Sequence, residues 1–130
     1  MIKNKDIMLK KGQFPIVQYN LILKETLEEM NKFNLGIACL VDKNYKLKGI
    51  ITDGDIRRKL LNDQKPFSAF FVDDSIKHAI KKPKSSTINK NIQETLKVMN
   101  KFEIWDMPIV EKNKLVGLVH LHPAMKKLIK

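Results

Sequence analysis

The sequence predicts an α/β fold built from two similar units, and the strongest reason is an internal repeat. Residues 24–33 return as residues 93–102, with an offset of 69 because Glu94 corresponds to Glu25. In both copies, short apolar runs alternate with amphipathic helical stretches. A chain of 130 residues is long enough for one compact domain or for two small halves that share a core. Since a unit of about 60 residues buries little apolar surface by itself, we expect the halves to pack as one integrated module.

The repeat also sets the expected boundaries: a lead-in at 1–13, a first unit at 14–65, and a linker with the second unit at 66–130. Each unit is expected to run strand, helix, strand, strand, helix, and the two units to be related by a pseudo-twofold axis. In the first unit the apolar residues Leu23, Leu27 and Met30 recur on one side of a helix. The elements expected there are strands at 14–18, 37–41 and 47–52 and helices at 21–33 and 53–61.

The second unit repeats this order after a linker at 62–84, in which a short helix is expected at 75–80. Pro108 cannot donate a backbone hydrogen bond, so its strand should be an edge strand or carry a bulge. Pro123 suits the first turn of a helix. The elements expected in the second unit are strands at 85–88, 107–110 and 115–120 and helices at 91–103 and 123–128.

The stretch at 49–58, Gly-Ile-Ile-Thr-Asp-Gly-Asp-Ile-Arg-Arg, is the strongest candidate for a site. Here an apolar strand turns directly into a helix with Thr52 at its N-cap. Gly54 leaves the backbone N–H groups of the first turn open to an anion, and Asp55 offers a carboxylate to the two hydroxyls of a ribose. The alternative is a well-capped helix without a ligand, in which Asp53 and Asp55 only complement the helix dipole.

A duplicated unit of this order, closed in one copy by Gly-Ile-Ile-Thr-Asp-Gly-Asp-Ile, resembles a tandem pair of cystathionine β-synthase (CBS) domains. The resemblance covers about residues 14–128. Residues 49–58 and the ending at 116–122 are similar to the CBS segment of arabinose-5-phosphate isomerases, which act in making keto-deoxy-octulosonate. CBS pairs of sugar nucleotidyltransferases and of sialic-acid-type synthases are equally compatible parents. The sugar-isomerase domain that carries catalysis in the first group is absent from this chain.

The resemblance implies that the Thr and Asp of the corner hold the phosphate and ribose of a nucleotide, roles that fall here on Thr52 and Asp55. Asp53 and Gly54 belong to the same corner, and Arg58 is placed to reach a ligand phosphate bidentately. The implied ligand is AMP, ATP or a sugar nucleotide, and no cofactor is required. The implied role is regulatory: the module is not itself an enzyme and modulates an attached or partner enzyme of bacterial surface-sugar biosynthesis.

The second corner departs from the first. When the copies are aligned on Gly117, His120 replaces Thr52 and Pro123 replaces Asp55, so the ribose-holding carboxylate is lost. His120 and His122 therefore form a possible second site that binds something different, or a corner filled by its own side chains. A metal is not expected, because no third ligand lies nearby in the sequence.

Two further features have open interpretations. Lys81 and Lys82 either form a solvated turn or screen a ligand phosphate. Trp105 takes the place of Gly36 and is expected in the core or an interface, with a stacking platform for a base as the alternative.

Composition excludes several classes of protein. The formal net charge is +11, but arginine occurs only at Arg57 and Arg58 and the lysines are dispersed, so a nucleic-acid partner is not expected. No apolar run approaches membrane-spanning length, and the single cysteine, Cys39, suits a reducing, cytoplasmic setting. No acid–base pair, catalytic triad or phosphate-binding Walker loop is present, which also argues against catalysis.

The helices that follow the two corners carry apolar positions that predict a homodimer. On a small monomer an exposed apolar stripe would favour aggregation, and a twofold interface would bury it. A scaffold or oligomerisation module without a ligand is the alternative function, and a basic nucleic-acid binder is a third. The positions concerned are Ile56, Leu60, Leu61, Met125 and Leu128.

Overall fold

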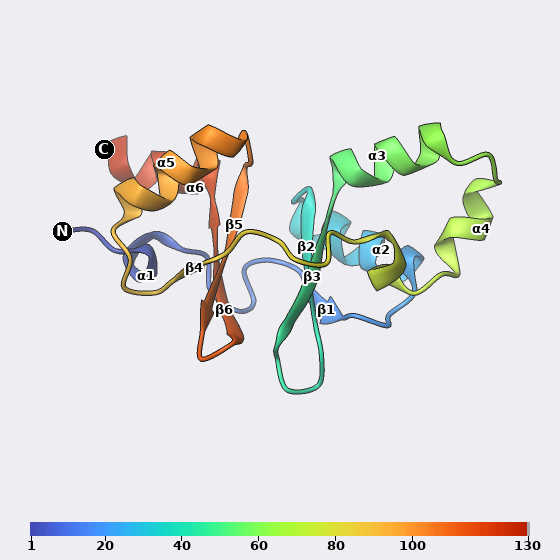
Figure 1. Cartoon of the computed structure of the whole chain (residues 1–130), viewed down its shortest axis with the longest axis horizontal. Helices are drawn as coiled ribbons and strands as arrows, with labels where there is room; N and C mark the ends of the chain where they lie inside the picture. The colour runs from blue at the N-terminus through green and yellow to red at the C-terminus, as the bar shows by residue number, and fades with distance from the viewer. Residues whose placement is uncertain (130) are drawn as a thin grey trace. The chain divides into compact units, whose positions relative to one another are not determined.

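The computed structural model describes residues 1–129 as two compact bodies (Figure 1). The central body comprises Gly12–Pro83. The terminal body comprises Met1–Lys11 together with the chain from Lys84 onward. Each body contains one three-stranded sheet with helices packed on it, so the predicted α/β class and the two repeated units are confirmed. No helix among the described residues is long and apolar enough to cross a membrane.

The central body is built on a sheet of order β1-β2-β3, in which β2 pairs parallel with β1 and antiparallel with β3. Every residue of β2 is buried, as its continuous apolar sequence predicts. Its elements are β1 Ile16–Gln18, α2 Leu23–Phe33, β2 Ile37–Val41, β3 Leu47–Thr52, α3 Asp53–Asn62, α4 Phe67–Phe71 and the 3₁₀ helix η1 Ser75–His78.

The terminal body repeats this arrangement with a sheet of order β4-β5-β6, parallel between the first two strands and antiparallel between the last two. Each strand and helix expected from the sequence is present, with ends shifted by at most two residues. The sequence pattern did not predict the five-residue helix α4, which belongs to the central body. The elements are α1 Asn4–Ile7, β4 Ser86–Thr87, α5 Ile92–Phe102, β5 Asp106–Glu111, β6 Lys114–His120 and α6 Leu121–Ile129.

Each body has its own apolar core between one sheet face and its helices. In the central body Leu23 and Met30 of α2 meet Leu40 of β2 and Phe70 of α4. In the terminal body Met99 of α5 meets Ile109 of β5 and Ala124 of α6. The equivalent helices α2 and α5 both end at a residue in the left-handed conformation, Asn34 at φ 55° and Glu103 at φ 54°.

The lead-in expected at 1–13 is instead part of the terminal body. The backbone N–H of Asn4 donates to Lys90 O at 2.9 Å, and Leu9 and Leu118 exchange two backbone hydrogen bonds of 2.7 and 3.0 Å. The segment at 66–83, expected to accompany the second unit, lies in the central body. There Ile50 and Ile80 exchange backbone hydrogen bonds of 3.0 and 2.9 Å.

These two segments occupy equivalent places, which extends the repeat beyond the aligned sequence. Lys3 bridges to Asn91 as Asp74 bridges to Ile22, so α1 corresponds to η1 with an offset of 71. Each segment covers the last strand of its sheet and donates hydrogen bonds to the chain that leads into a helix. Sequence comparison missed this equivalence because the segments share almost no residue types.

The structure also tests the expectations for Pro108 and Trp105: the bulge, one of the two alternatives for the Pro108 strand, is present, whereas Trp105 is not in the core. Pro108 lies in β5, the central strand and not an edge. It is tolerated because β4 pairs only with Ile109 and Val110, and the register shifts between those two residues. Trp105 is 67% exposed, so it is not a core residue of the terminal body.

We predict that Gly117→Ala destabilises the protein by about 1–3 kcal/mol, because overpacking a rigid site costs this much. A Cβ at Gly117 would overlap Met8 Sδ and would lie 2.9 Å from the backbone oxygen of Leu9. Gly54→Ala is the control, since its Cβ would meet only the flexible Arg58 guanidinium at 3.3 Å. Urea unfolding of both variants measures the difference. Equal losses would show that the close approach of Leu9 is not a packing constraint.

Candidate functional site

The corner between β3 and α3 is held by reciprocal hydrogen bonds between Thr52 and Asp55. Thr52 is the N-cap, with extended dihedrals of φ −121° and ψ 159°, and its Oγ1 accepts from the Asp55 backbone N–H at 3.2 Å. Asp55 Oδ2 accepts from the Thr52 N–H at 3.3 Å and from the Thr52 hydroxyl at 2.8 Å. This capping box fixes the position of both side chains that the sequence assigned to the site.

Arg58 folds back over the first turn of α3. Its Nη2 donates to Asp55 Oδ1 at 2.8 Å, so each carboxylate oxygen of Asp55 has a partner. The guanidinium also lies against the open face of Gly54, where a Cβ would stand 3.3 Å from both terminal nitrogens. The Arg58 side chain is more than half exposed and the Asp55 side chain is not, so the arginine is the more accessible partner of this pair.

Asp53 faces a different hollow from Asp55. Its N–H donates to Gly36 O at 3.0 Å, and its carboxylate occupies the space beside Gly36, where a Cβ would lie 2.7 Å from Oδ2. A hollow of about 280 Å³ borders Asp53, Gly36 and the end of α2. The structure therefore groups Thr52, Gly54, Asp55 and Arg58 and sets Asp53 apart from them.

A cavity of about 300 Å³ lies beside Asp55 and Arg58. One wall is α3, which contributes Lys59 and Asn62, and the other is the segment His78–Ala79–Ile80. Sequence reasoning missed this second wall, because only the backbone pairing of Ile80 with Ile50 brings it to the corner. No local sequence motif marks this wall, because a backbone pairing between distant residues forms it. Lys81 and Lys82 follow this wall directly and are exposed, as a role in screening a phosphate requires.

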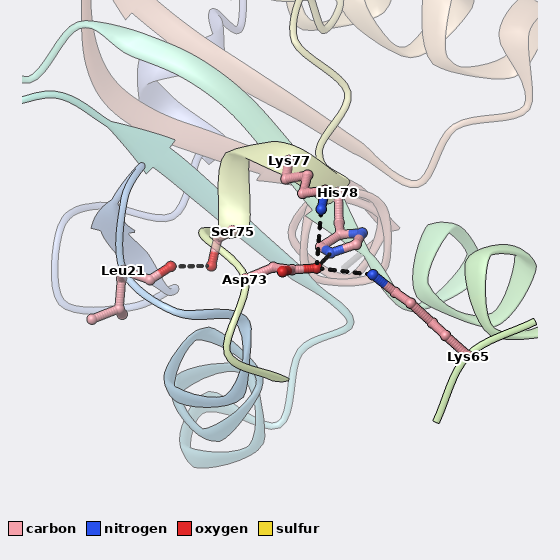
Figure 2. A network of polar contacts seen from close by, with 6 residues as sticks. All are labelled: Leu21, Lys65, Asp73, Ser75, Lys77 and His78. Carbon is pink, nitrogen blue, oxygen red and sulfur yellow. Dashed lines mark hydrogen bonds and ion pairs between the residues drawn. The ribbon is translucent and has the colours of Figure 1, made fainter. Parts of the chain in front are cut away.

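Asp73, five residues before His78 in the chain, is the centre of a polar network (Figure 2). Its Oδ2 lies 2.9 Å from His78 Nε2, 3.3 Å from Lys65 Nζ and 3.6 Å from Lys77 Nζ. The hydrogen bond to His78, reinforced by Lys65, holds the pKa of the Asp73 carboxyl below its usual value. Asp73 therefore stays ionised and ties α4, η1 and the intervening turn together.

The second corner is filled by its own side chains. In the terminal sheet Asp106 pairs with His120 at the place where the central sheet pairs Ile37 with Thr52. His120 Nδ1 lies 2.5 Å from Asp106 Oδ1, and both side chains are largely buried. Sequence reasoning missed Asp106, although an acidic residue at the start of an apolar strand was a visible signal.

The two histidines of this corner do not converge. His122 lies in the first turn of α6 and is exposed, whereas His120 is the last residue of β6 and is paired with Asp106. Among residues 1–129 no group of three or more His, Cys, Asp or Glu side chains is arranged to hold a metal ion.

Comparison with known proteins identifies the fold. Residues 5–62 match the CBS domain family. The crystal structure of CBSX2 in complex with AMP superimposes with a TM-score of 0.86 and 16% identity, covering 99% of this chain and 97% of that chain. The chain has the fold of a CBS domain pair. The resemblance drawn from the repeat and from residues 49–58 is thereby confirmed.

Two curated relatives of this CBS pair are much longer proteins. An uncharacterized protein of Rickettsia prowazekii is 34% identical over 125 residues, which is 96% of this chain and 37% of that protein. Arabinose 5-phosphate isomerase KdsD of Yersinia pestis is 26% identical over 126 residues, which is 97% of this chain and 37% of the isomerase. The chain thus spans little more than a third of the length of these relatives.

We predict that Asp106 makes stability fall as the pH rises just above 3.8, the ordinary carboxyl pKa. Burial raises the pKa of Asp106, and the attraction of His120 offsets only part of this. In that window the folded state holds the proton more tightly than the unfolded state, so raising the pH lowers the free energy of unfolding. Urea unfolding of the wild type and of Asp106→Asn between about pH 3.5 and 7 measures the difference. If the free energy of unfolding of the wild type instead rose with pH relative to that of Asp106→Asn, His120 would be stabilising the carboxylate.

Proposed function

We propose that this CBS pair is a regulatory module that binds an adenine nucleotide or a sugar nucleotide at the β3–α3 corner. The observation that carries the proposal is the placement of Thr52, Asp55 and Arg58 around the first turn of α3, next to a cavity of about 300 Å³. The N-terminus of a helix attracts a phosphate, and a neighbouring carboxylate accepts hydrogen bonds from ribose hydroxyls. The AMP complex of CBSX2 supports an adenine nucleotide as the ligand.

Ligand binding exchanges one partner of Asp55 for another. The ribose hydroxyls donate to Asp55 Oδ1, the oxygen that Arg58 contacts in the free protein. Arg58 is then released to pair with the phosphate, where a guanidinium makes two parallel hydrogen bonds. Thr52 keeps its capping bond to the Asp55 N–H, so α3 stays anchored during this exchange.

The two corners are unequal, and we propose one nucleotide per chain. The second corner has no acceptor at Pro123, and the proline ring removes a backbone N–H that a phosphate would need. His120 is already paired with Asp106, which leaves only His122 free to meet a ligand there. Any occupancy near His120 and His122 is therefore anionic and weaker.

The regulated enzyme is an arabinose-5-phosphate isomerase or another enzyme of bacterial surface-sugar biosynthesis, either fused to the module or associated with it. The similarity to KdsD of Yersinia pestis supports this choice. The matched segment is 37% of that protein, so catalysis belongs to the remaining part of such an enzyme. The nucleotide acts by favouring one arrangement of the module over another, which biases the enzyme through differential affinity. The setting is cytoplasmic, where nucleotides are available.

We predict that AMP stabilises the protein and that Asp55→Ala weakens this binding roughly ten- to hundred-fold. Removing a hydrogen-bonding group that is charged costs about 1.5–3 kcal/mol. AMP at 100 times its dissociation constant should raise the free energy of unfolding by about 2.7 kcal/mol, which thermal melting detects. Calorimetry then gives the affinity and the stoichiometry, which should be one AMP per chain.

Asp53→Ala is the matched control, because it removes a carboxylate from the same helical turn on the side of the other hollow. It should leave the affinity for AMP nearly unchanged, and circular dichroism should show both variants folded. Equal affinity of the Asp55→Ala variant and the wild type would remove Asp55 from the site. Two equivalent sites per chain would contradict the proposed asymmetry.

A scaffold role without a ligand is the second candidate, favoured by apolar side chains that the described residues leave exposed. The structure corrects the predicted dimer stripe in part, since Ile56, Leu60 and Leu128 pack against the cores of their own bodies. Leu61 is 76% exposed, and Met125 also remains accessible. Phe67 adds a third exposed apolar side chain that the sequence pattern did not include.

We predict a homodimer at micromolar concentration, because association buries these exposed side chains. Sedimentation should give twice the mass of the chain. The double variant Leu61→Lys with Met125→Lys should shift the equilibrium toward monomer without unfolding, since both positions are exposed. A wild type that sediments as a monomer contradicts the prediction. Dimerisation without any effect of nucleotides on melting would favour the scaffold role.

A further inference from the structure

We propose that the central body contains a second small-molecule site, an apolar cavity under α3 and α4 that binds a compact aromatic molecule carrying one hydrogen-bond donor. Nδ1 of His78 accepts the hydrogen bond from this molecule. The proposal uses a cavity and a polar atom that the nucleotide proposal does not use, and the two cavities share His78 and Lys59 in their linings.

The cavity has a volume of about 190 Å³. Leu23 and Leu27 of α2 form its floor, Ile56 and Leu60 of α3 form one wall, and the phenylalanines of α4 form the other. An apolar cavity of about 150 Å³ inside a protein stays dry and binds benzene. The volume here therefore suits a single six-membered ring with one small substituent. Phe67 lines the cavity and is 63% exposed, so the cavity reaches the surface at this residue.

Two polar residues border this apolar lining, His78 of η1 and Lys59 of α3, and His78 is the buried one. It is only 4% exposed, and its Nδ1 has no hydrogen-bond partner. In Figure 2 this nitrogen points away from Asp73, on the side where α3 passes. A buried nitrogen without a partner has lost its hydrogen bonds to water and has gained none from the protein, which is uncommon in folded proteins. A ligand that donates one hydrogen bond removes this deficit.

The network around Asp73 determines which kind of ligand fits. The Asp73 carboxylate is ionised and can only accept hydrogen bonds, so His78 Nε2 carries the proton that lies between them. We assign the tautomer from this network. In the neutral tautomer that carries this proton on Nε2, Nδ1 is an acceptor and requires a donor such as a hydroxyl or N–H. Phe70 packs against the imidazole in a tilted arrangement, with ring centroids 5.4 Å apart and an interplanar angle of 55°.

The terminal body shows that the fold does not require this polar pair. By the offset of 71 that relates η1 to α1, His78 corresponds to Ile7 and Asp73 corresponds to Ile2. Ile7 is buried in the terminal core at 6% exposure, where it serves as an ordinary apolar packing residue. The same structural position thus works with isoleucine. The histidine, with one nitrogen bound and the other bare, therefore indicates a function beyond packing.

Phenol and toluene are the matched probes, because they share one ring and differ in a hydroxyl donor. Heteronuclear NMR titration should show phenol binding about tenfold more tightly than toluene, as expected for one buried hydrogen bond. In protein labelled with ¹⁵N-histidine, phenol should move the Nδ1 resonance of His78, and toluene should leave it in place. If a water molecule is the natural occupant of the cavity, neither probe should bind. That result would overturn the proposal.

Two variants separate recognition from simple filling of the cavity. His78→Ile copies the residue at the equivalent position of the terminal body, and it should abolish the preference for phenol while leaving toluene binding unchanged. Leu27→Phe fills the cavity and should abolish binding of both probes. An unchanged phenol preference in His78→Ile would refute the role of Nδ1. If His78→Ile does not fold, the ¹⁵N shift in the wild type and the Leu27→Phe variant decide the question.

Discussion

The structure depends on one constraint that occurs twice: a chain segment lies so close to the last strand of each sheet that only glycine fits between them. Gly49 of β3 faces the backbone of Ile80, and Gly117 of β6 faces the backbone of Leu9. At both places the backbones exchange two hydrogen bonds beside the glycine. A side chain at either position would push the segments apart and leave backbone polar groups unpaired. These contacts close each sheet and assign residues 1–11 and the segment after α4 to their bodies.

The same constraint assembles the candidate site. Because Ile80 is held against Ile50, the residues before it form a wall opposite Asp55 and Arg58. His78 is thereby brought to α3 from more than 15 residues away in sequence, and Asp73 holds it there. Helix α3 lies between two hollows of different chemistry, one polar and bordered by Asp55, the other apolar and bordered by Ile56 and Leu60. A ligand in either hollow contacts the same helix, which gives the two sites a physical route for influencing each other.

Each body also has an Asp–His pair at positions where the other body has different residue types. Asp73 and His78 stand where the terminal body has Ile2 and Ile7. Asp106 and His120 stand where the central body pairs Ile37 with Thr52. Duplication thus preserved the backbone, while the side chains diverged at the places where a ligand would bind. In the central body the change leaves a bare nitrogen beside a cavity, and in the terminal body it closes the corner.

Local patterns in the sequence were sufficient for the fold class, the order of the strands and helices, and the Thr52–Asp55 corner. Apolar periodicity and helix capping act over a few residues, so they can be read from neighbours in the chain. The 69-residue offset revealed the duplication because α2 and α5 keep their residue types.

Only the tertiary structure decided which segments complete each body and which side chains meet at each corner. The equivalence of α1 and η1 rests on backbone hydrogen bonds, which leave no pattern of side chains to detect. The partners of His78 and His120 depend on strand register and on a long-range bridge, and the exposure of Trp105 depends on what the fold leaves uncovered. Burial, pairing and cavities arise between residues far apart in sequence, and for that reason they had to come from the structure.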